Sequence, residues 1–133
     1  MDCPADIIFV VDESTSVRAS NFTLMKSFLS ALVGRLDIDS GNTRVGLVKF
    51  SSSVNTSGAF NLSSYSSVAD VQSAISSLTY GQGRTNTAAA LAHVRTTMLT
   101  SAAGDRSDVP NAVVVMTDGK SNVNVDQTLV STV

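Results

Sequence analysis

The chain has 133 residues, 43% of them hydrophobic and 15% charged, which are proportions of a single globular domain rather than of a disordered segment. A net charge of −2, without any block of Lys or Arg, argues against nucleic acid as a partner, since nothing would neutralise a run of phosphates. No apolar stretch approaches the roughly 20 residues of a membrane-spanning helix, so we expect no membrane insertion.

The first half of the chain predicts a strand, a helix and two further strands. Residues 7–11 (IIFVV) predict a strand that is buried on both faces. Ser20 is the expected N-cap of a helix over 21–36, whose apolar residues fall on one stripe. A second strand follows at 44–51 (RVGLVKFS), and GAFNL at 58–62 is a candidate for a short edge strand.

The second half of the chain continues this alternation of helices and strands. Ser67 is the expected cap of a helix over 68–78, and Thr85 is the expected cap of a helix over 86–100. The run AVVVMT at 112–117 then predicts a second fully buried strand.

Strands that alternate with helices predict an α/β fold: a doubly wound, mainly parallel sheet with helices on both faces. The two all-apolar strands, 7–11 and 112–116, are expected at the centre of the sheet, and residues 125–133 look like the start of another helix. Ligands of such sheets bind outside the carboxyl ends of the strands. We therefore expect a binding site at that edge.

Carboxylate and hydroxyl side chains gather at the expected carboxyl edge. Asp12 follows the first strand and Asp118 follows the last, so that the two carboxylates would face one crevice. Ser14 and Ser16 can point to the same side of the turn after Asp12, and Thr85 arrives from the neighbouring Gly-rich turn. A divalent cation would relieve the repulsion between the carboxylates. These hard oxygen ligands suit Mg²⁺, Mn²⁺ or Ca²⁺, and suit Zn²⁺ or Cu²⁺ poorly.

Each of these residues also has a plain structural explanation, because aspartates start turns and hydroxyls cap helices. Their joint occurrence at the ends of strands is what favours a metal site.

Known catalytic motifs do not match, so we do not predict an enzyme. A phosphatase of the haloacid dehalogenase type needs a second aspartate where the chain has Ser14. A serine hydrolase needs a base, but the only histidine, His93, lies within a predicted helix. GKS at 119–121 lacks the earlier glycine of a phosphate-binding loop, because Val114 stands there. A metal-assisted phosphatase or hydrolase is the least favoured alternative.

A single cysteine and three glycosylation sequons favour an extracellular origin. Cys3 is either a free thiol or half of a disulfide with a residue outside this chain. The sequons make Asn21, Asn55 and Asn61 candidate N-glycosylation sites. Dispersed basic residues are assigned to the solvated surface: Lys26, Arg35, Arg44 and Lys49.

These pieces resemble the metal-ion-dependent adhesion site of von Willebrand factor type A domains. The resemblance consists of Asp12-x-Ser14-x-Ser16, Thr85 within GRTNTAAAL, and Asp118 with the following glycine, in the family's order along essentially the whole chain. It implies that Ser14, Ser16 and Thr85 bind the cation directly, while Asp12 and Asp118 act largely through water. The segment PADIIFVVDES is most similar to the sequences of matrilins, collagen VI-like chains and invertebrate matrix or shell proteins.

The resemblance implies a secreted adhesion or matrix-assembly module. Its cation would recruit an acidic group of an extracellular-matrix protein or of another ligand with an exposed carboxylate. A matrix polysaccharide or a mineral surface is a further candidate ligand. The main alternative is a structural interaction module that does not use the metal.

The chain departs from the family pattern in two side chains and in length. Glu13 stands where the family often has Gly or Ser, and Arg84 stands where it often has Gly, so each adds a charge beside the site. Family members continue through further strands and helices. We therefore expect this domain, residues 1–133, to lack its last elements, and Cys3 to have its disulfide partner among them.

Overall fold

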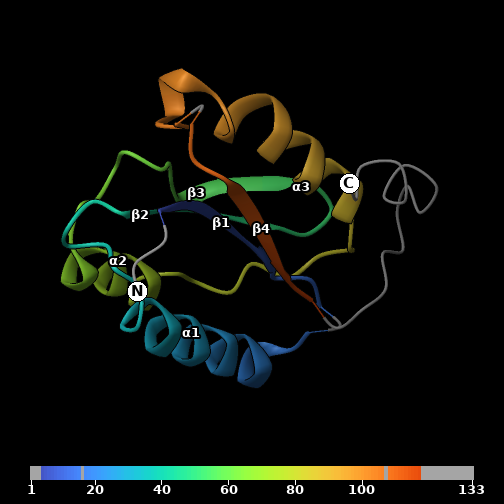
Figure 1. The fold of residues 1–133 in the computed structure, drawn as a ribbon. Helices are drawn as coiled ribbons and strands as arrows, with labels where there is room; N and C mark the ends of the chain where they lie inside the picture. The colour runs from blue at the N-terminus through green and yellow to red at the C-terminus, as the bar shows by residue number, and fades with distance from the viewer. Residues whose placement is uncertain (1–3, 16, 107, 118–133) are drawn as a thin grey trace.

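A computed structural model describes residues 4–15, 17–106 and 108–117 of the chain (Figure 1). Its strands and helices alternate as predicted. The strands are β1 (Ala5–Asp12), β2 (Thr43–Phe50), β3 (Val54–Phe60) and β4 (Asn111–Met116). The α-helices are α1 (Ala19–Val33), α2 (Val68–Ser76) and α3 (Thr87–His93), and a π-helical turn (Val94–Met98) and a short 3₁₀ turn (Ser101–Ala103) lead from α3 towards β4.

The sheet is mostly parallel, which confirms the predicted fold class. Its strand order is β3-β2-β1-β4. β1 runs parallel to β2 and to β4, whereas β3 pairs with β2 in the antiparallel direction. The register places Asp12 beside Phe50 of β2 and Val11 beside Met116 of β4. The carboxyl ends of the three parallel strands therefore meet at one edge.

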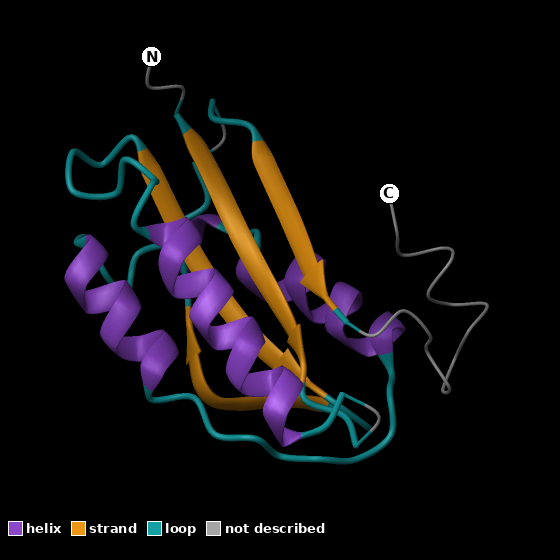
Figure 2. Cartoon of the chain, turned by 90° about the horizontal axis from the view of Figure 1, so that it is seen from below, coloured by secondary structure: helices purple, strands orange, loops and turns teal. Residues whose placement is uncertain are grey.

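Helices cover both faces of this sheet. Helices α1 and α2 lie on one face and α3 lies on the other (Figures 1 and 2). Along β1, Phe9 and Val11 join the core beneath α1 and α2, while Ile8 and Val10 join the core beneath α3. All of them are fully buried, because successive side chains of a strand point to opposite faces. This is why β1 is apolar without alternation, as predicted.

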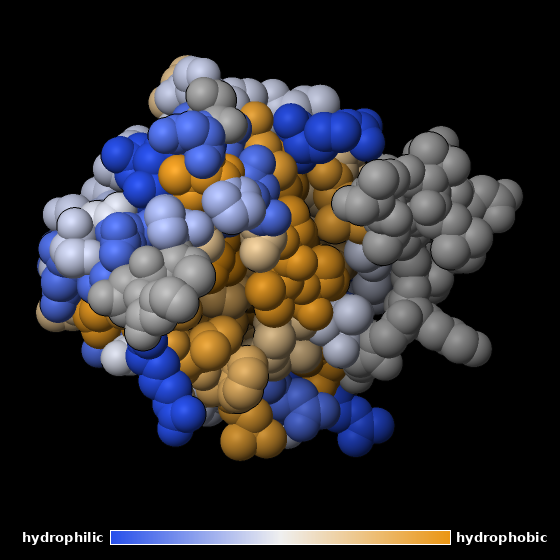
Figure 3. All heavy atoms as spheres, viewed as in Figure 1, coloured by the Kyte–Doolittle hydropathy of each residue, from blue (hydrophilic) through white to orange (hydrophobic). Residues whose placement is uncertain are grey.

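β4 is less buried than predicted. Its apolar run alone suggested a fully buried central strand, whereas the expected loss of the last elements implied a bare parallel edge. β4 does form an edge of the described sheet, and Val113 is 38% exposed. Among the described residues, β4 pairs with β1 alone, so its outer side has no covering strand. Apolar surface gathers over β4 accordingly (Figure 3).

Two predicted helix caps are wrong. α1 begins after Arg18 rather than at Ser20, and the Arg18 backbone, at φ 71°, donates its N–H to the hydroxyl of Tyr80 (3.1 Å). The side chain of Asn86, not that of Thr85, accepts the capping hydrogen bond of α3. Ser67 does cap α2 as predicted.

Two predicted boundaries also differ. The segment 86–100 is helical for most of its length, but it changes from α to π geometry at Val94. β3 begins at Val54, well before the predicted edge strand at 58–62. The predicted helix at 125–133 lies outside the described residues. No helix in the described ranges is long and apolar enough to cross a membrane.

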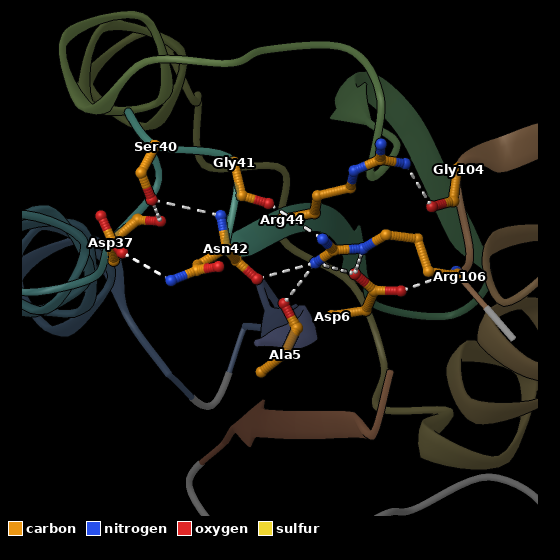
Figure 4. Close-up of polar contacts among 9 residues, drawn as sticks. All are labelled: Ala5, Asp6, Asp37, Ser40, Gly41, Asn42, Arg44, Gly104 and Arg106. Carbon is orange, nitrogen blue, oxygen red and sulfur yellow. Dashed lines mark hydrogen bonds and ion pairs between the residues drawn. The ribbon is translucent and has the colours of Figure 1, made fainter. Parts of the chain in front are cut away.

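Arg106 holds together the amino ends of the strands, opposite the expected site (Figure 4). Its Nε and Nη2 donate to Oδ1 of Asp6 at 2.9 and 2.8 Å, and its backbone N–H donates to Oδ2 at 2.8 Å. The guanidinium also donates to the carbonyls of Ala5, Gly41 and Asn42. Because Asp6 is fully buried, this ion pair fixes the loop before β4 to the starts of β1 and β2.

Candidate metal centre

β1 delivers Asp12 to the carboxyl edge of the sheet, where the side chain is fully buried. Its Oδ1 accepts the backbone N–H of Ser14 at 2.8 Å, and its Oδ2 accepts the hydroxyl of Thr117 at 2.7 Å. Thr117 directly follows β4, so its hydrogen bond to Asp12 connects the ends of the two neighbouring strands. Asp118, the next residue in the sequence, lies outside the described residues, as does Ser16.

The loop that carries Thr85 is bound to the turn that carries Ser14. Thr15 and Gly83 exchange two hydrogen bonds: the Thr15 N–H donates to the Gly83 carbonyl (2.8 Å), and the Gly83 N–H donates to the Thr15 hydroxyl (3.0 Å). The Tyr80 hydroxyl donates to the Ser14 carbonyl (2.8 Å). Ser14 and Thr85 are themselves at most 1% exposed. The structure thus brings together two of the sequence segments from which the site was predicted.

Unusual backbone conformations mark both of these loops. Arg18 (φ 71°) and Gln82 (φ 65°) are the non-glycine residues of the described chain with positive φ. Gly83, at φ 127°, has no room for a side chain, because a Cβ would lie 2.9 Å from the Ser51 hydroxyl oxygen. Such strained positions persist where the surrounding contacts hold them, and they concentrate at functional sites.

Asp12 differs from the other buried carboxylates in its charge environment. Asp6, Asp12 and Glu13 are each at most 1% exposed. Asp6 pairs with Arg106 and Glu13 pairs with Lys49. Within the part of the chain that the structure describes, no Lys, Arg or His side chain forms an ion pair with Asp12. A buried carboxylate without a cation is costly, so this position calls for a positive charge from elsewhere.

The donors at this edge fit a hard divalent cation. A carboxylate has about four lone-pair sites, so Asp12 keeps acceptor capacity beyond its two hydrogen bonds. Ser14 and Thr85 add hydroxyl oxygens, which are neutral and hard. The described residues contain no group of three or more His, Cys, Asp or Glu side chains that could hold a metal, so a cation here would depend on hydroxyls as well as carboxylates.

Glu13, the residue after Asp12, belongs to a buried polar network that no sequence pattern predicted. Its Oε1 lies 3.0 Å from Nζ of Lys49, and its Oε2 accepts the side-chain N–H of Asn55 at 2.8 Å. Lys49 Nζ also donates to the carbonyl of Thr79 at 2.6 Å. Oε1 has no hydrogen bond of good angle despite the short distance, so the contact with Lys49 is chiefly one of charge.

The assignment of Lys49 to the solvated surface is therefore wrong, because its side chain is 2% exposed. A signal was available: Lys49 stands between Val48 and Phe50 in an otherwise apolar strand. The charge that Glu13 adds beside the site is balanced by this lysine.

The remaining predicted residues take varied positions. Asn21 is exposed on α1, Asn61 lies in a turn after β3, and Asn55 belongs to the network of Glu13. Arg84 is exposed beside Thr85, and His93 is the last residue of α3. Cys3 lies outside the described residues.

Comparison with known proteins identifies a family. A family model for the von Willebrand factor type A domain matches residues 6–132. The chain is 41% identical over 124 residues to the mouse collagen alpha-4(VI) chain, a match that covers 92% of this chain and 5% of the collagen. It is 39% identical over 123 residues to human matrilin-4, which covers 90% of this chain and 20% of the matrilin. The chain therefore spans a small part of the length of these relatives.

Solved structures agree with this relationship. Proximal thread matrix protein 1 from the mussel byssus matches with a TM-score of 0.83 at 31% identity, covering 91% of this chain and 32% of that protein. Another structure of the mussel protein, with a TM-score of 0.78 at 30% identity over the same shares, is described as having a zinc-occupied MIDAS motif, the metal-ion-dependent adhesion site. The chain belongs to the von Willebrand factor type A domain family.

Proposed function

We propose that this domain is a metal-dependent adhesion module of an extracellular-matrix protein, in which a divalent cation recruits an acidic group of a protein ligand. The observation that carries the proposal is the fully buried carboxylate of Asp12, which has no cationic partner in the described ranges. A bound Mg²⁺, or Mn²⁺ or Ca²⁺ in its place, would supply the positive charge that this carboxylate lacks.

In this proposal Ser14, Ser16 and Thr85 are direct ligands, and Asp12 and Asp118 act largely through water. The hydrogen bonds of Asp12 are consistent with that role, because the Ser14 N–H and the Thr117 hydroxyl already orient both of its oxygens. Hydroxyl ligands leave the cation with much of its positive charge. A cation held in this way would be able to attract a carboxylate of the ligand, which is the chemistry that adhesion through this site requires.

The relatives support the setting and the class of cation. Collagen, matrilin and thread matrix proteins favour a secreted matrix module over an enzyme. One structure of the mussel protein is described as having a zinc-occupied MIDAS motif, although hard oxygen ligands are expected to suit zinc poorly. Zn²⁺ therefore belongs among the cations to be tested on this chain.

Substitution of Asp12 by Asn tests the proposal, because it removes the charge and retains the shape. For the parent, a cation at 100 times its Kd should add about 2.7 kcal/mol to the free energy of unfolding. Asp12→Asn should lose this gain, yet be at least as stable as the parent in chelator, since it removes a buried unpaired charge. Asp108→Asn, at an exposed aspartate, is the matched control and should keep the gain.

Thermal unfolding with Mg²⁺, Mn²⁺, Ca²⁺ or Zn²⁺ against chelator measures these effects. An equal cation-dependent gain in Asp12→Asn and in the parent would contradict the site assignment. A folded parent that gains nothing from any cation would instead favour the structural module that does not use the metal.

A further inference from the structure

Glu13 and Lys49 form a buried pair of opposite charges at the end of β1, next to candidate cation-binding residues in the sequence. Their side chains are 1% and 2% exposed, and Oε1 and Nζ are 3.0 Å apart. Glu13 lies between Asp12 and Ser14 in the sequence, and Lys49 precedes Phe50, the residue that pairs with Asp12 in the sheet. The pair is thus held at the end of β1, close to both of these candidate cation-binding residues.

The pair also reaches the loop that leads to Thr85. Lys49 donates to the carbonyl of Thr79 at 2.6 Å. The carboxylate of Glu13 occupies the space beside Gly81, where an added Cβ would lie 2.6 Å from Oε1. Replacing either charge would therefore alter the strand end and this loop together.

A simple stabilising role does not account for the choice of charged residues. A buried ion pair is often no more stabilising than apolar side chains of similar volume, because both charges lose their hydration. Both charges would, however, act on a cation bound nearby, since Coulomb interactions are strong in a protein interior. Without Lys49, the charge of Glu13 would raise the affinity of the site for the cation and reduce the attraction between the cation and a ligand carboxylate. Without Glu13, the charge of Lys49 would repel the cation.

We propose that Glu13 and Lys49 are a charge-balancing pair that sets the strength of the metal centre. Their opposite charges cancel at the cation, which keeps it bound and leaves it able to attract an acidic ligand. This inference rests on the proposed function of the site. It makes Glu13 and Lys49 residues that tune the cation through their charges and are not among its proposed ligands.

Cation affinity distinguishes this role from a merely structural one. We expect Glu13→Gln to weaken Mn²⁺ binding on the order of tenfold, because the uncompensated Lys49 then repels the ion. We expect Lys49→Met to tighten Mn²⁺ binding by a similar factor and to weaken the binding of a probe peptide that carries a carboxylate side chain. The double variant should return to within about threefold of the parent affinity. If the pair were only structural, both single changes would weaken Mn²⁺ binding, and the double change would not restore it.

The measurement is calorimetric titration of each folded variant with Mn²⁺, accompanied by unfolding in chelator to record stability separately. Asn55→Thr is the control, because it removes a hydrogen bond to Glu13 without changing any charge, and it should leave Mn²⁺ affinity within about threefold. Should Lys49→Met fail to fold, the comparison of Glu13→Gln with the double variant decides: stronger binding by the double variant supports the pair.

Two results would overturn the inference. The first is a double variant that binds Mn²⁺ no better than Glu13→Gln. The second is a Glu13→Gln variant with the affinity of the parent. A parent that binds no divalent cation would overturn the proposed function as well, so the two failures are distinguishable.

Discussion

Replacing Arg106 by Gln should remove a large share of the stability of this domain. The substitution leaves Asp6 fully buried without a cation, and breaking a buried pair from one side costs about 3–5 kcal/mol. It also removes donors from the carbonyls of Ala5, Gly41 and Asn42. Because a domain has only about 5–15 kcal/mol of stability in total, Arg106→Gln should be near the limit of folding.

Replacing Asp6, the other partner of the ion pair, should destabilise the domain less. In Asp6→Asn the guanidinium keeps its carbonyl acceptors and is 20% exposed, so water can still solvate its charge. We expect a cost of roughly 1–3 kcal/mol, that of a hydrogen-bonded charged group losing one partner. Arg106→Lys should fall between the two, since an ammonium keeps the charge but cannot replace the bidentate contact and the carbonyl bonds together.

Equilibrium unfolding in urea, with the m value compared across variants, measures these costs. Arg35→Gln, at an exposed arginine, is the control and should change stability by less than about 0.5 kcal/mol. An Arg106→Gln protein within about 1 kcal/mol of the parent would refute the reasoning. So would an Asp6→Asn protein that is less stable than Arg106→Gln.

Two further predictions concern the Glu13 network. Gly81→Ala should lower the free energy of unfolding in urea by roughly 1–3 kcal/mol, since the new Cβ would lie 2.6 Å from the carboxylate of Glu13. Unchanged stability would contradict this, because it would mean that the loop moves aside without cost. In secreted protein, we expect glycans at Asn21 and Asn61 but not at Asn55, because the Asn55 side-chain nitrogen lies 2.8 Å from a buried oxygen of Glu13. Glycopeptide mapping checks this, and occupied Asn55 in folded protein would contradict it.

Local patterns were sufficient to predict the fold class. β1 could be predicted because both of its faces are buried, which leaves an uninterrupted apolar run with Asp12 at its end. The Ser67 cap was predictable for a similar reason, because its side chain acts on a neighbour in the sequence, Asp70. The resemblance to a known family then related Asp12, Ser14 and Thr85 to one another.

Interactions between distant residues could not be predicted in this way. Lys49 is buried because Glu13 neutralises it, and no local pattern connects the two residues. Arg106 lies in a loop without periodicity, yet it determines how the strands begin. Thr85 and Asn86 are both competent caps; Asn86 takes the role, and its backbone N–H donates to the carbonyl of Ser51, which is distant in the sequence.

The most direct test of the metal centre is Mn²⁺ titration of a Thr85→Val variant. The substitution removes the hydroxyl of Thr85, which is 1% exposed, and nearly preserves the shape of the side chain. The proposed site predicts that Mn²⁺ affinity falls by more than about tenfold, since even outer-shell partners of a metal typically contribute that much. Stability in chelator should change by no more than about 1–2 kcal/mol. A Thr85→Val protein that binds Mn²⁺ as tightly as the parent would contradict the assignment of Thr85 as a ligand, and with it the proposed centre.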